Sequence, residues 1–312
     1  MKKIKIAFIG AGYMNNLHIY SFRKIKNAKI VGVVSKQNTS SKILGKKHNI
    51  KVYLSIKDLM LTTKPDITVV AVSDPDLLKF YKNLFKFKST FLIEKPAGYS
   101  FLEAKKIYIL AKKMKTNVYV GLNRINYNVT QKVLNDLEKK SPKRIVKVVD
   151  QENNDSKIFF NRERKINKNW MFANSIHLIH YFNILCRGKV NSVNSLKIYE
   201  KKKLIFISSK IIFSSGDIGI YECYWNMPGF WSVTVTTSLK KWQLKPLENL
   251  KIFNKKNKLT FFCEEKIGKN LKAGLLNQAI NLIKAFNKQK SNLVSLKESL
   301  HTMELIHKIY FK

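Results

Sequence analysis

The chain has 312 residues, a formal net charge of +39 and 45% hydrophobic residues, and these values exclude several classes of protein. A chain of this length is long enough for two domains with a hydrophobic core each. Its apolar content is that of a folded protein, and no apolar run reaches the roughly 18 residues that a membrane-spanning helix needs. We therefore expect a two-domain globular protein with no membrane partner.

The positive charge comes almost wholly from lysine, since Lys and Arg together number 59 and only six of these are Arg. The lysines are spread evenly, without a dense basic tail or the aromatic motif of an RNA-binding domain. Nucleic-acid binding is therefore not expected. Attraction of phosphorylated cofactors and anionic substrates is expected, because such a surface raises their local concentration.

The cysteines and the first residues both favour a cytoplasmic protein. Cys186, Cys223 and Cys263 are odd in number and lack the spacing of a metal site, as expected for reduced thiols. Lys5 interrupts the apolar run at the start of the chain, and no small-residue cleavage site follows it. We interpret this run as a first strand rather than as a secretion signal.

Residues 1–122 alternate short apolar runs with amphipathic segments, a pattern typical of parallel strands joined by helices. The expected strands are Ile4–Ile9, Ile30–Val34, Val52–Tyr53, Ile67–Val72, Thr90–Ile93 and Asn117–Val120. The expected helices are Tyr13–Lys26, Ser40–His48, Ile56–Leu61, Asp76–Phe87 and Phe101–Met114. Strands buried on both faces indicate a doubly wound parallel sheet, which predicts a dinucleotide-binding Rossmann domain over 1–122.

Residues 123–312 predict an α+β domain for substrate binding and oligomerisation, built on a large open and mostly antiparallel sheet. Its expected strands are Arg144–Val149, Val190–Tyr199, Leu204–Ser208, Lys210–Ser214, Gly219–Trp225, Trp231–Ser238 and Leu250–Phe253. Its expected helices are Val129–Lys139, Trp170–Leu185, Leu271–Asn287 and Leu296–Tyr310. The last helix is also able to return to the first domain, which would make the boundary non-contiguous.

A glycine-rich turn follows the first expected strand and opens a helix, which is the context of a dinucleotide-binding fingerprint. Its residues are Gly10, Gly12, Tyr13, Met14 and Asn15. The two glycines allow a tight turn and a close approach of the backbone to a pyrophosphate at the helix N-terminus. Asn15 stands where the full fingerprint has a third glycine, so the match is incomplete. An ordinary strand-to-helix turn is the alternative.

The ends of two further strands carry candidate cofactor residues. Ser35 and Lys36 end the second strand, where an NAD site usually has an acid for the ribose hydroxyls. A hydrogen-bond donor and a cation at this position favour the 2'-phosphate of NADP over NAD. Ser73, Asp74 and Pro75 follow the fourth strand, where ligands bind such sheets, and they are expected to contact the nicotinamide or its ribose. A simple helix cap is the alternative.

These landmarks occur in the order found in one family. The chain resembles the glucose-fructose oxidoreductase and inositol dehydrogenase (Gfo/Idh/MocA) family over its whole length. The resemblance is carried by Gly10-x-Gly12, His18, Asp74-Pro75, Glu94-Lys95-Pro96, Gly121-Leu122-Asn123-Arg124, the segment Trp170–Ile179 and Leu271-Lys272-Ala273-Gly274.

The resemblance implies hydride transfer between the nicotinamide and a sugar-like alcohol or ketone. It implies that Lys95 contacts the reacting oxygen, that the Lys95–Pro96 bond is cis, and that His177 donates or accepts a proton near the substrate hydroxyl. The family's usual aspartate four residues before this histidine is here Ala173. The neighbouring Asn174 is able to bind substrate but not to exchange protons at neutral pH.

Four further residues receive roles or alternatives from the same reasoning. Glu94 and Asn123 are expected beside the cofactor, and Arg124 beside the substrate. His180 lies one turn after His177, and three-residue spacing would suit a metal. No carboxylate or cysteine nearby in the sequence completes such a site, so no metal is expected.

The sequence therefore predicts an NADP- or NAD-dependent oxidoreductase that acts on a sugar or nucleotide-sugar and assembles as a homodimer or homotetramer. Its segment Trp170–Ile179 is similar to relatives linked to surface-polysaccharide biosynthesis. An inositol or polyol dehydrogenase is one alternative. A non-catalytic dinucleotide-binding sensor or interaction protein is another, because the third glycine and the helix aspartate are absent.

Overall fold

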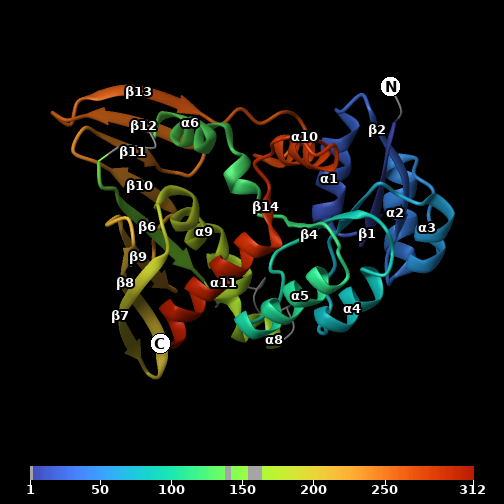
Figure 1. Cartoon of the computed structure of the whole chain (residues 1–312), viewed down its shortest axis with the longest axis horizontal. Helices are drawn as coiled ribbons and strands as arrows, with labels where there is room; N and C mark the ends of the chain where they lie inside the picture. Colours follow the sequence, from blue (N-terminus) through green and yellow to red (C-terminus); the bar gives the residue numbers. More distant parts are fainter. Residues whose placement is uncertain (1–2, 138–141, 154–163) are drawn as a thin grey trace. The chain divides into compact units, whose positions relative to one another are not determined.

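The computed structural model describes residues 3–137, 142–153 and 164–312, and the chain forms two compact units (Figure 1). The first unit comprises Met1–Gly98, Leu102–Asn126 and Ile267–Leu300. The second unit comprises Tyr99–Phe101, Tyr127–Lys266 and His301–Lys312. No helix among the described residues is long and apolar enough to cross a membrane.

The first unit contains a six-stranded sheet in the order β14-β5-β4-β3-β1-β2. All its pairings are parallel except that of β14 with β5. The strands are β1 (Ile4–Ile9), β2 (Ala28–Val34), β3 (Ile67–Val70), β4 (Thr90–Ile93), β5 (Val118–Val120) and β14 (Val294–Ser295). The helices are α1 (Tyr13–Arg23), α2 (Asn38–His48), α3 (Ile56–Thr63), α4 (Leu77–Leu84), α5 (Phe101–Lys113), η1 (Asn123–Asn126), α10 (Leu275–Phe286) and the start of α11 (Leu296–Phe311).

Buried apolar strands explain this sheet. All four residues of β3 and of β4 are buried, and five of the six in β1 are, so these strands lie in the interior with helices on both faces. Their core includes residues from α10 near the end of the chain, since Leu282 and Ile283 pack with Ile6 and Phe8. The predicted doubly wound sheet is confirmed.

One expected strand of this unit is reduced to a single bridge. Val52 pairs with Val33 in a parallel bridge, and no longer ladder forms. The chain turns away because the Tyr53 ring packs over Gly32, where a side-chain Cβ would lie 2.5 Å from that ring. Ser55 then caps α3 by accepting a hydrogen bond from the backbone N–H of Asp58.

The second unit contains an eight-stranded sheet in the order β13-β12-β11-β10-β6-β9-β8-β7. Only β6 and β9 pair in parallel, so the predicted mostly antiparallel sheet is confirmed. The strands are β6 (Ile145–Glu152), β7 (Val190–Glu200), β8 (Lys203–Phe213), β9 (Ile218–Trp225), β10 (Ser232–Thr236), β11 (Lys240–Leu244), β12 (Asn249–Asn254) and β13 (Leu259–Glu264).

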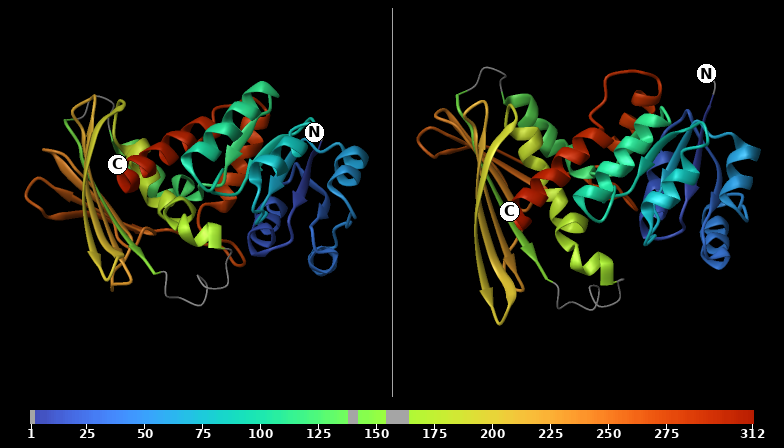
Figure 2. Two further views of the ribbon diagram at one scale, coloured as in Figure 1. Left: turned by 90° about the horizontal axis from the view of Figure 1, so that it is seen from below. Right: turned by 60° about the horizontal axis from the view of Figure 1, so that its bottom comes forward.

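Helices of the second unit cover one face of this sheet (Figure 2). They include α6 (Asn128–Asp136), the π-helical turn η2 (Met171–Ser175), α9 (Ile176–Leu185) and the end of α11. The short helix α8 (Arg164–Lys168) precedes η2. The expected end of the α6 segment, at Lys139, lies outside the described residues. Among the described residues, the other face of the sheet carries no helix in either view of Figure 2.

The buried Asp217, just before β9, is hydrogen-bonded to residues that precede β6 and β7. Both oxygens of Asp217 accept hydrogen bonds from the Arg187 guanidinium, at 2.7 and 2.9 Å, and from the backbone N–H groups of Arg144 and Arg187. Burial opposes ionisation, but these donors outweigh it and hold the pKa of Asp217 at about 2.

Asp217 is therefore expected to make the protein less stable in acid. Its pKa is lower in the folded chain than in the unfolded one, so its stabilisation is complete above about pH 4 and disappears as the pH falls to about 2. Asp217→Asn should lower the free energy of unfolding by about 2 kcal/mol at neutral pH, and this difference should shrink over that interval. Urea denaturation at a series of pH values, with the exposed Asp58→Asn as the control, measures it. An equal loss at every pH would contradict the prediction.

Candidate active site

The glycine turn after β1 adopts the geometry that the fingerprint requires. Gly10 has a φ of +96°, and a Cβ added to it would lie 2.1 Å from the backbone oxygen of Ala71. Only glycine fits there. A Cβ on Gly12, in contrast, would meet no atom within 4 Å, so this backbone faces open space at the N-terminus of α1. No side chain caps that terminus, and its N–H groups remain available to an anion.

Asn15 holds the turn in place of the third glycine. Its side chain is fully buried, and its amide nitrogen donates hydrogen bonds to the backbone oxygens of Ile9 and Gly10 at 2.8 and 2.7 Å. A side chain is accommodated at this position because its amide satisfies two backbone carbonyls of the turn. The side chain of Asn15 therefore serves the turn itself.

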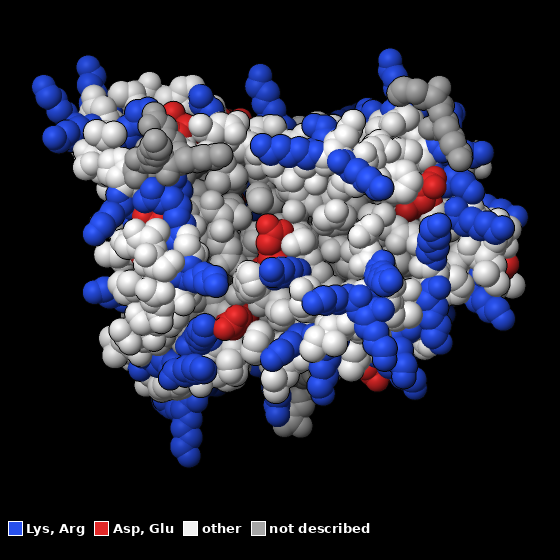
Figure 3. Space-filling view, viewed as in Figure 1, with Lys and Arg blue, Asp and Glu red and all other residues white. Residues whose placement is uncertain are grey.

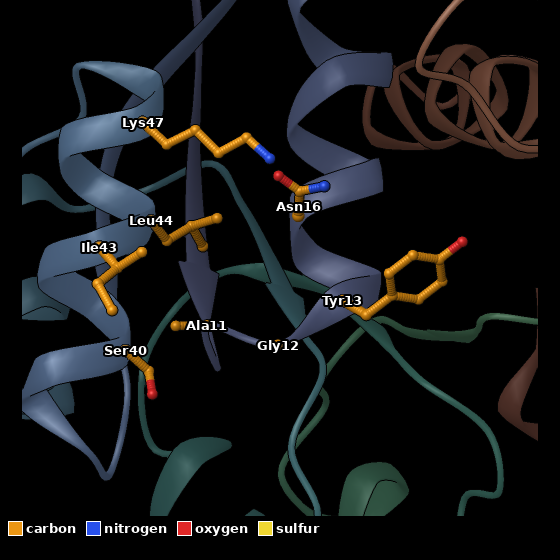
Figure 4. Close-up of a pocket in the computed structure, with 8 residues that line it drawn as sticks. All are labelled: Ala11, Gly12, Tyr13, Asn16, Ser40, Ile43, Leu44 and Lys47. Atoms are coloured by element: carbon orange, nitrogen blue, oxygen red, sulfur yellow. The ribbon is translucent and has the colours of Figure 1, made fainter.

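A pocket of about 320 Å³ lies between the start of α1 and the inner side of α2 (Figure 4). Its lining residues are Ala11, Gly12, Tyr13, Asn16, Ser40, Ile43, Leu44 and Lys47. In Figure 4 the Lys47 side chain extends across the pocket toward Asn16, and Tyr13 points outward. Open backbone at Gly12 and an adjoining pocket fit the phosphates and one arm of a dinucleotide, so the residues present suit this cofactor.

The residues expected after β2 and β3 lie at the same edge of the sheet as the glycine turn after β1. Ser35 is half-buried and donates its hydroxyl to the backbone oxygen of Gln37 at 2.7 Å, whereas Lys36 is exposed. Ser73 and Pro75 are exposed. Asp74 accepts a hydrogen bond from the N–H of Asp76, and Asp76 rather than Asp74 caps α4. The cap expected at this turn thus falls on Asp76.

Glu94 pairs with a buried histidine that is also part of the family pattern. Its Oε1 lies 2.9 Å from Nε2 of His18 on α1. Gly121 makes room for this carboxylate, since a Cβ there would lie 2.8 Å from Oε1 of Glu94. The loop that begins after β4 is thereby tied to the helix of the fingerprint. The expected cis bond between Lys95 and Pro96 is present in this loop.

The remaining candidates of the first unit lie near the same edge. Lys95 is partly exposed, two residues beyond the end of β4. Asn123 is buried, and its amide donates to the backbone oxygen of Ala273 at 2.9 Å, which joins η1 to the segment before α10. Arg124 follows it in η1 and is partly exposed.

In the second unit, the expected catalytic helix begins with a π-helical turn. Ala173 and Asn174 lie in this turn, and His177 lies in the first turn of α9. Ala173 and His177 are buried, whereas Asn174 is partly exposed. π-helical turns occur frequently at functional sites, because the extra residue changes which side chains share a face. His180 bonds the Thr302 hydroxyl at 2.8 Å, and no cluster suited to a metal occurs among the described residues.

The structure adds two acids that the sequence reasoning missed. Asp150 and Glu152 end β6 on its inward face, and Glu152 contacts the π-helical turn through Trp170, Asn174 and Ser175. The expected strand ended at Val149, where the apolar alternation stops. The alternation itself was the available signal, because Val146, Val148 and the two acids all have the same parity.

The family model described as "Oxidoreductase family, NAD-binding Rossmann fold" (GFO_IDH_MocA) matches residues 4–122. This dinucleotide-binding region belongs to the GFO_IDH_MocA oxidoreductase family. The match confirms the predicted family, the oxidoreductase class and a nicotinamide dinucleotide as the cofactor. No curated protein matches the chain.

Solved structures extend the fold likeness to the whole chain. UDP-N-acetylglucosamine 3-dehydrogenase GnnA from Acidithiobacillus ferrooxidans is 11% identical with a TM-score of 0.80, and the match covers 99% of this chain and 97% of GnnA. A dehydrogenase (MviM) from Clostridium difficile is 18% identical, with a TM-score of 0.82 and 99% of both chains covered. An oxidoreductase from Agrobacterium radiobacter, solved with NAD+, L-tartaric acid and magnesium, is 13% identical; its TM-score is 0.79, with 99% and 96% covered.

Proposed function

We propose that this family member transfers hydride between a nicotinamide dinucleotide and a hydroxyl-bearing or ketone carbon of a sugar or nucleotide-sugar. The observation that carries the proposal is the placement of Lys95. The parallel strands β1 and β4 end at the same edge of one sheet, so the open backbone at Gly12 and the Lys95 loop belong to the same edge. A cation beside the dinucleotide turn suits an alcohol whose oxygen gains negative charge during the reaction.

The bound dinucleotide supplies the hydride acceptor or donor. In this proposal, Gly10 and Gly12 shape the phosphate turn, with Tyr13 and Met14 beginning the helix behind it. Lys95 donates a hydrogen bond to the reacting oxygen and holds or returns its proton. Glu94 keeps the Lys95 loop in register through His18.

Substrate contacts are proposed for three further residues. Arg124 provides a cation for an anionic group, Asn174 a hydrogen bond for a hydroxyl, and His177 a proton donor or acceptor. Asn123 and the segment Ser73–Pro75 complete the cofactor surroundings. Because Ala173 replaces the family's acid, Lys95 carries more of the proton transfer than it would beside an aspartate.

The charge of the chain supports a nucleotide-sugar within this substrate class. Lysine and arginine side chains are scattered over the face seen in Figure 3 with few acids between them, in keeping with the net charge of +39. A diphosphate would be attracted to such a surface, whereas a neutral polyol would not. GnnA, which shares the fold, is described as acting on UDP-N-acetylglucosamine. We therefore propose a nucleotide-sugar as the substrate, with an inositol or polyol as the second candidate. The resemblance of the segment Trp170–Ile179 to relatives linked to surface-polysaccharide biosynthesis supports a reaction in that process.

Direct binding and turnover test this function. The purified protein should bind NADPH or NADH with micromolar affinity in a fluorescence titration, and it should reduce NADP+ or NAD+ when given UDP-N-acetylglucosamine. Turnover with myo-inositol instead would favour the polyol reading. Binding of a dinucleotide without turnover of either substrate would favour the non-catalytic sensor, which the alanine at 173 makes the alternative of another class. Failure to bind either dinucleotide overturns the proposal.

The preference for NADP rests on the end of β2, where Ser35 and Lys36 stand without an acid. Lys36→Glu should weaken NADPH binding by about 10- to 100-fold, because it replaces an attraction to the 2'-phosphate by a repulsion. The affinity for NADH should change by less than about 3-fold. Lys29→Glu, the same charge change at the other end of β2, is the matched control. Equal losses for NADPH and NADH would contradict this assignment.

We further propose a cytoplasmic homo-oligomer, a dimer or a tetramer. The three cysteines are unpaired, as expected in a reducing compartment. Exposed apolar side chains lie on strands of the large sheet, at Leu196 and Ile198 on β7 and at Phe261 and Phe262 on β13. Such residues on a sheet suit contact with a second copy of the chain. Light scattering of the purified protein at several concentrations tests the assembly.

A further inference from the structure

Two acids end β6 side by side on the face that packs against helices. Asp150 is fully buried and Glu152 is 2% exposed. They follow Val146 and Val148 in the same alternation, so they occupy positions that an ordinary sheet would fill with apolar residues. Burying two carboxyls this close together is costly unless donors or protons compensate them.

Glu152 is surrounded by donors from the π-helical turn and the residue before it. Oε2 accepts hydrogen bonds from Nε1 of Trp170 at 2.6 Å and Nδ2 of Asn174 at 2.9 Å. Oε1 accepts from Nδ2 of Asn174 at 3.0 Å and the hydroxyl of Ser175 at 3.2 Å. Every contact presents a hydrogen to the carboxyl, which is the arrangement that stabilises an ionised carboxylate.

Asp150 accepts fewer hydrogen bonds than Glu152. Its Oδ2 accepts from the Tyr221 hydroxyl at 2.8 Å, and that hydroxyl lies 2.9 Å from the hydroxyl of Tyr310. Its buried Oδ1 has no hydrogen-bond partner among the described residues. Burial raises the pKa of Asp150, of Tyr221, Cys223 and Tyr310, and, together with the charge of Asp150, of Glu152. Within the described residues, no Lys or Arg forms an ion pair with either acid.

One proton held by the two acids relieves the repulsion between their carboxyl groups. Two adjacent buried carboxylates that form no ion pair with a Lys or Arg of the described residues repel each other, so one of them retains a proton at neutral pH. The four donor contacts on Glu152 favour a negative charge there, whereas burial and the charge of Asp150 raise its pKa to about 8. The two acids therefore share one proton and one negative charge as a pair.

The carboxyl group of Glu152 also sets the orientation of the side-chain amide of Asn174. The amide nitrogen of Asn174 bonds both carboxylate oxygens, so its own carbonyl oxygen points away from them. The reverse orientation would place two acceptors against each other. Asn174 is partly exposed, and its Oδ1 accepts no hydrogen bond within the described residues. This oxygen is thus an acceptor ready for a hydroxyl.

We propose that Asp150 and Glu152 form a one-proton carboxyl pair that fixes Asn174 with its side-chain carbonyl presented to a substrate hydroxyl. The part concerning substrate rests on the proposed function. Glu152 is then a positioning residue, acting through Asn174, and it supplies an acid to the helix turn in which the family's aspartate is replaced by Ala173. The pair discriminates in favour of a substrate that donates a hydrogen bond at this position.

NMR of the side-chain amides in the full-length protein tests the pair without substrate or cofactor. The NH2 signals of Asn174, assigned by their loss in Asn174→Asp, should exchange at least about tenfold more slowly than those of exposed Asn residues. Glu152→Gln should remove this protection, because the new amide presents its own hydrogens. Asp150→Asn should preserve the protection of the Asn174 amide, since Glu152 then carries the single charge of the pair. Glu222→Gln, which removes an outward-facing carboxylate of β9, is the control.

A reciprocal exchange keeps the test valid if a single variant folds poorly. Glu152→Gln combined with Asn174→Asp swaps donor and acceptor, so the outward oxygen is restored and the helical circular dichroism should match wild type. With UDP-N-acetylglucosamine as the probe, Glu152→Gln should weaken binding about tenfold and the double variant should recover most of it.

Loss of Asn174 protection in Asp150→Asn as well as in Glu152→Gln, or protection that survives in Glu152→Gln, would overturn the pair. Equal binding of the probe by wild type and Glu152→Gln would overturn the role toward substrate. A wild-type protein that binds neither dinucleotide would instead count against the proposed function, and the NMR result would stand independently of it.

Discussion

Lys95→Ala is expected to lower kcat by about 10²- to 10⁴-fold while leaving the affinity for the dinucleotide within about 3-fold of wild type. The side chain follows a strand end at the edge where the dinucleotide turn lies. In the proposed mechanism, removal of the amine removes the group that stabilises the developing charge on the reacting oxygen. Steady-state kinetics with UDP-N-acetylglucosamine, together with fluorescence titration of NADPH, separates the two effects.

Lys88→Ala is the matched control for this substitution. Lys88 is exposed and lies just before β4, at the opposite end of the strand from Lys95, so its loss changes the net charge equally. It should leave kcat and KM unchanged. Unchanged turnover in Lys95→Ala would remove this lysine from the chemistry, whereas a loss of dinucleotide affinity in the same proportion would make it a binding residue only.

Gly10→Ala and Gly12→Ala are expected to fail in different ways, although they lie two residues apart. A Cβ at Gly10 would collide with the backbone oxygen of Ala71 and would require an unfavourable φ of +96°. We expect Gly10→Ala to lower the free energy of unfolding by about 3 kcal/mol or more. A Cβ at Gly12 meets no atom, so Gly12→Ala should fold normally but bind NADPH at least about 10-fold more weakly, because the methyl group occupies the approach of the phosphates.

Thermal denaturation and fluorescence titration of both variants check this contrast. Gly10→Ala should melt several degrees below wild type, and Gly12→Ala at the wild-type temperature. Wild-type affinity for NADPH in Gly12→Ala would show that the phosphates do not lie over this backbone. Wild-type stability in Gly10→Ala would mean that the turn relaxes around the new side chain.

The sequence was most informative where strands are apolar on both faces. Runs such as Thr90–Ile93 predicted β4 to the residue, because burial demands continuous hydrophobicity. β13 was missed because its apolar residues do not alternate with polar ones and nearly all of them are exposed. β11, which begins with two lysines, was also missed.

The candidate site shows a similar division. Gly10 was predictable because a positive φ at a fixed place after a strand demands glycine. The hydrogen bonds of Asn15 to the turn were not predictable, because an amide that folds back on two carbonyls depends on the exact path of the backbone. Asp150 and Glu152 were missed because polar residues at the end of a strand resemble the start of a loop. Only the packing of η2 against β6 shows that both are buried.

The core of the first unit joins the two ends of the sequence, and this has a consequence for synthesis. Ile4, Ile6 and Phe8 pack with Leu282, Ile283 and Leu293, and β14 adds its edge pairing only after residue 294. A ribosome that has made the glycine turn must therefore still translate α10 and β14 before these apolar faces are covered. Until then the nascent chain exposes surfaces that general chaperones recognise, and premature termination anywhere before α10 leaves the dinucleotide fold without part of its core.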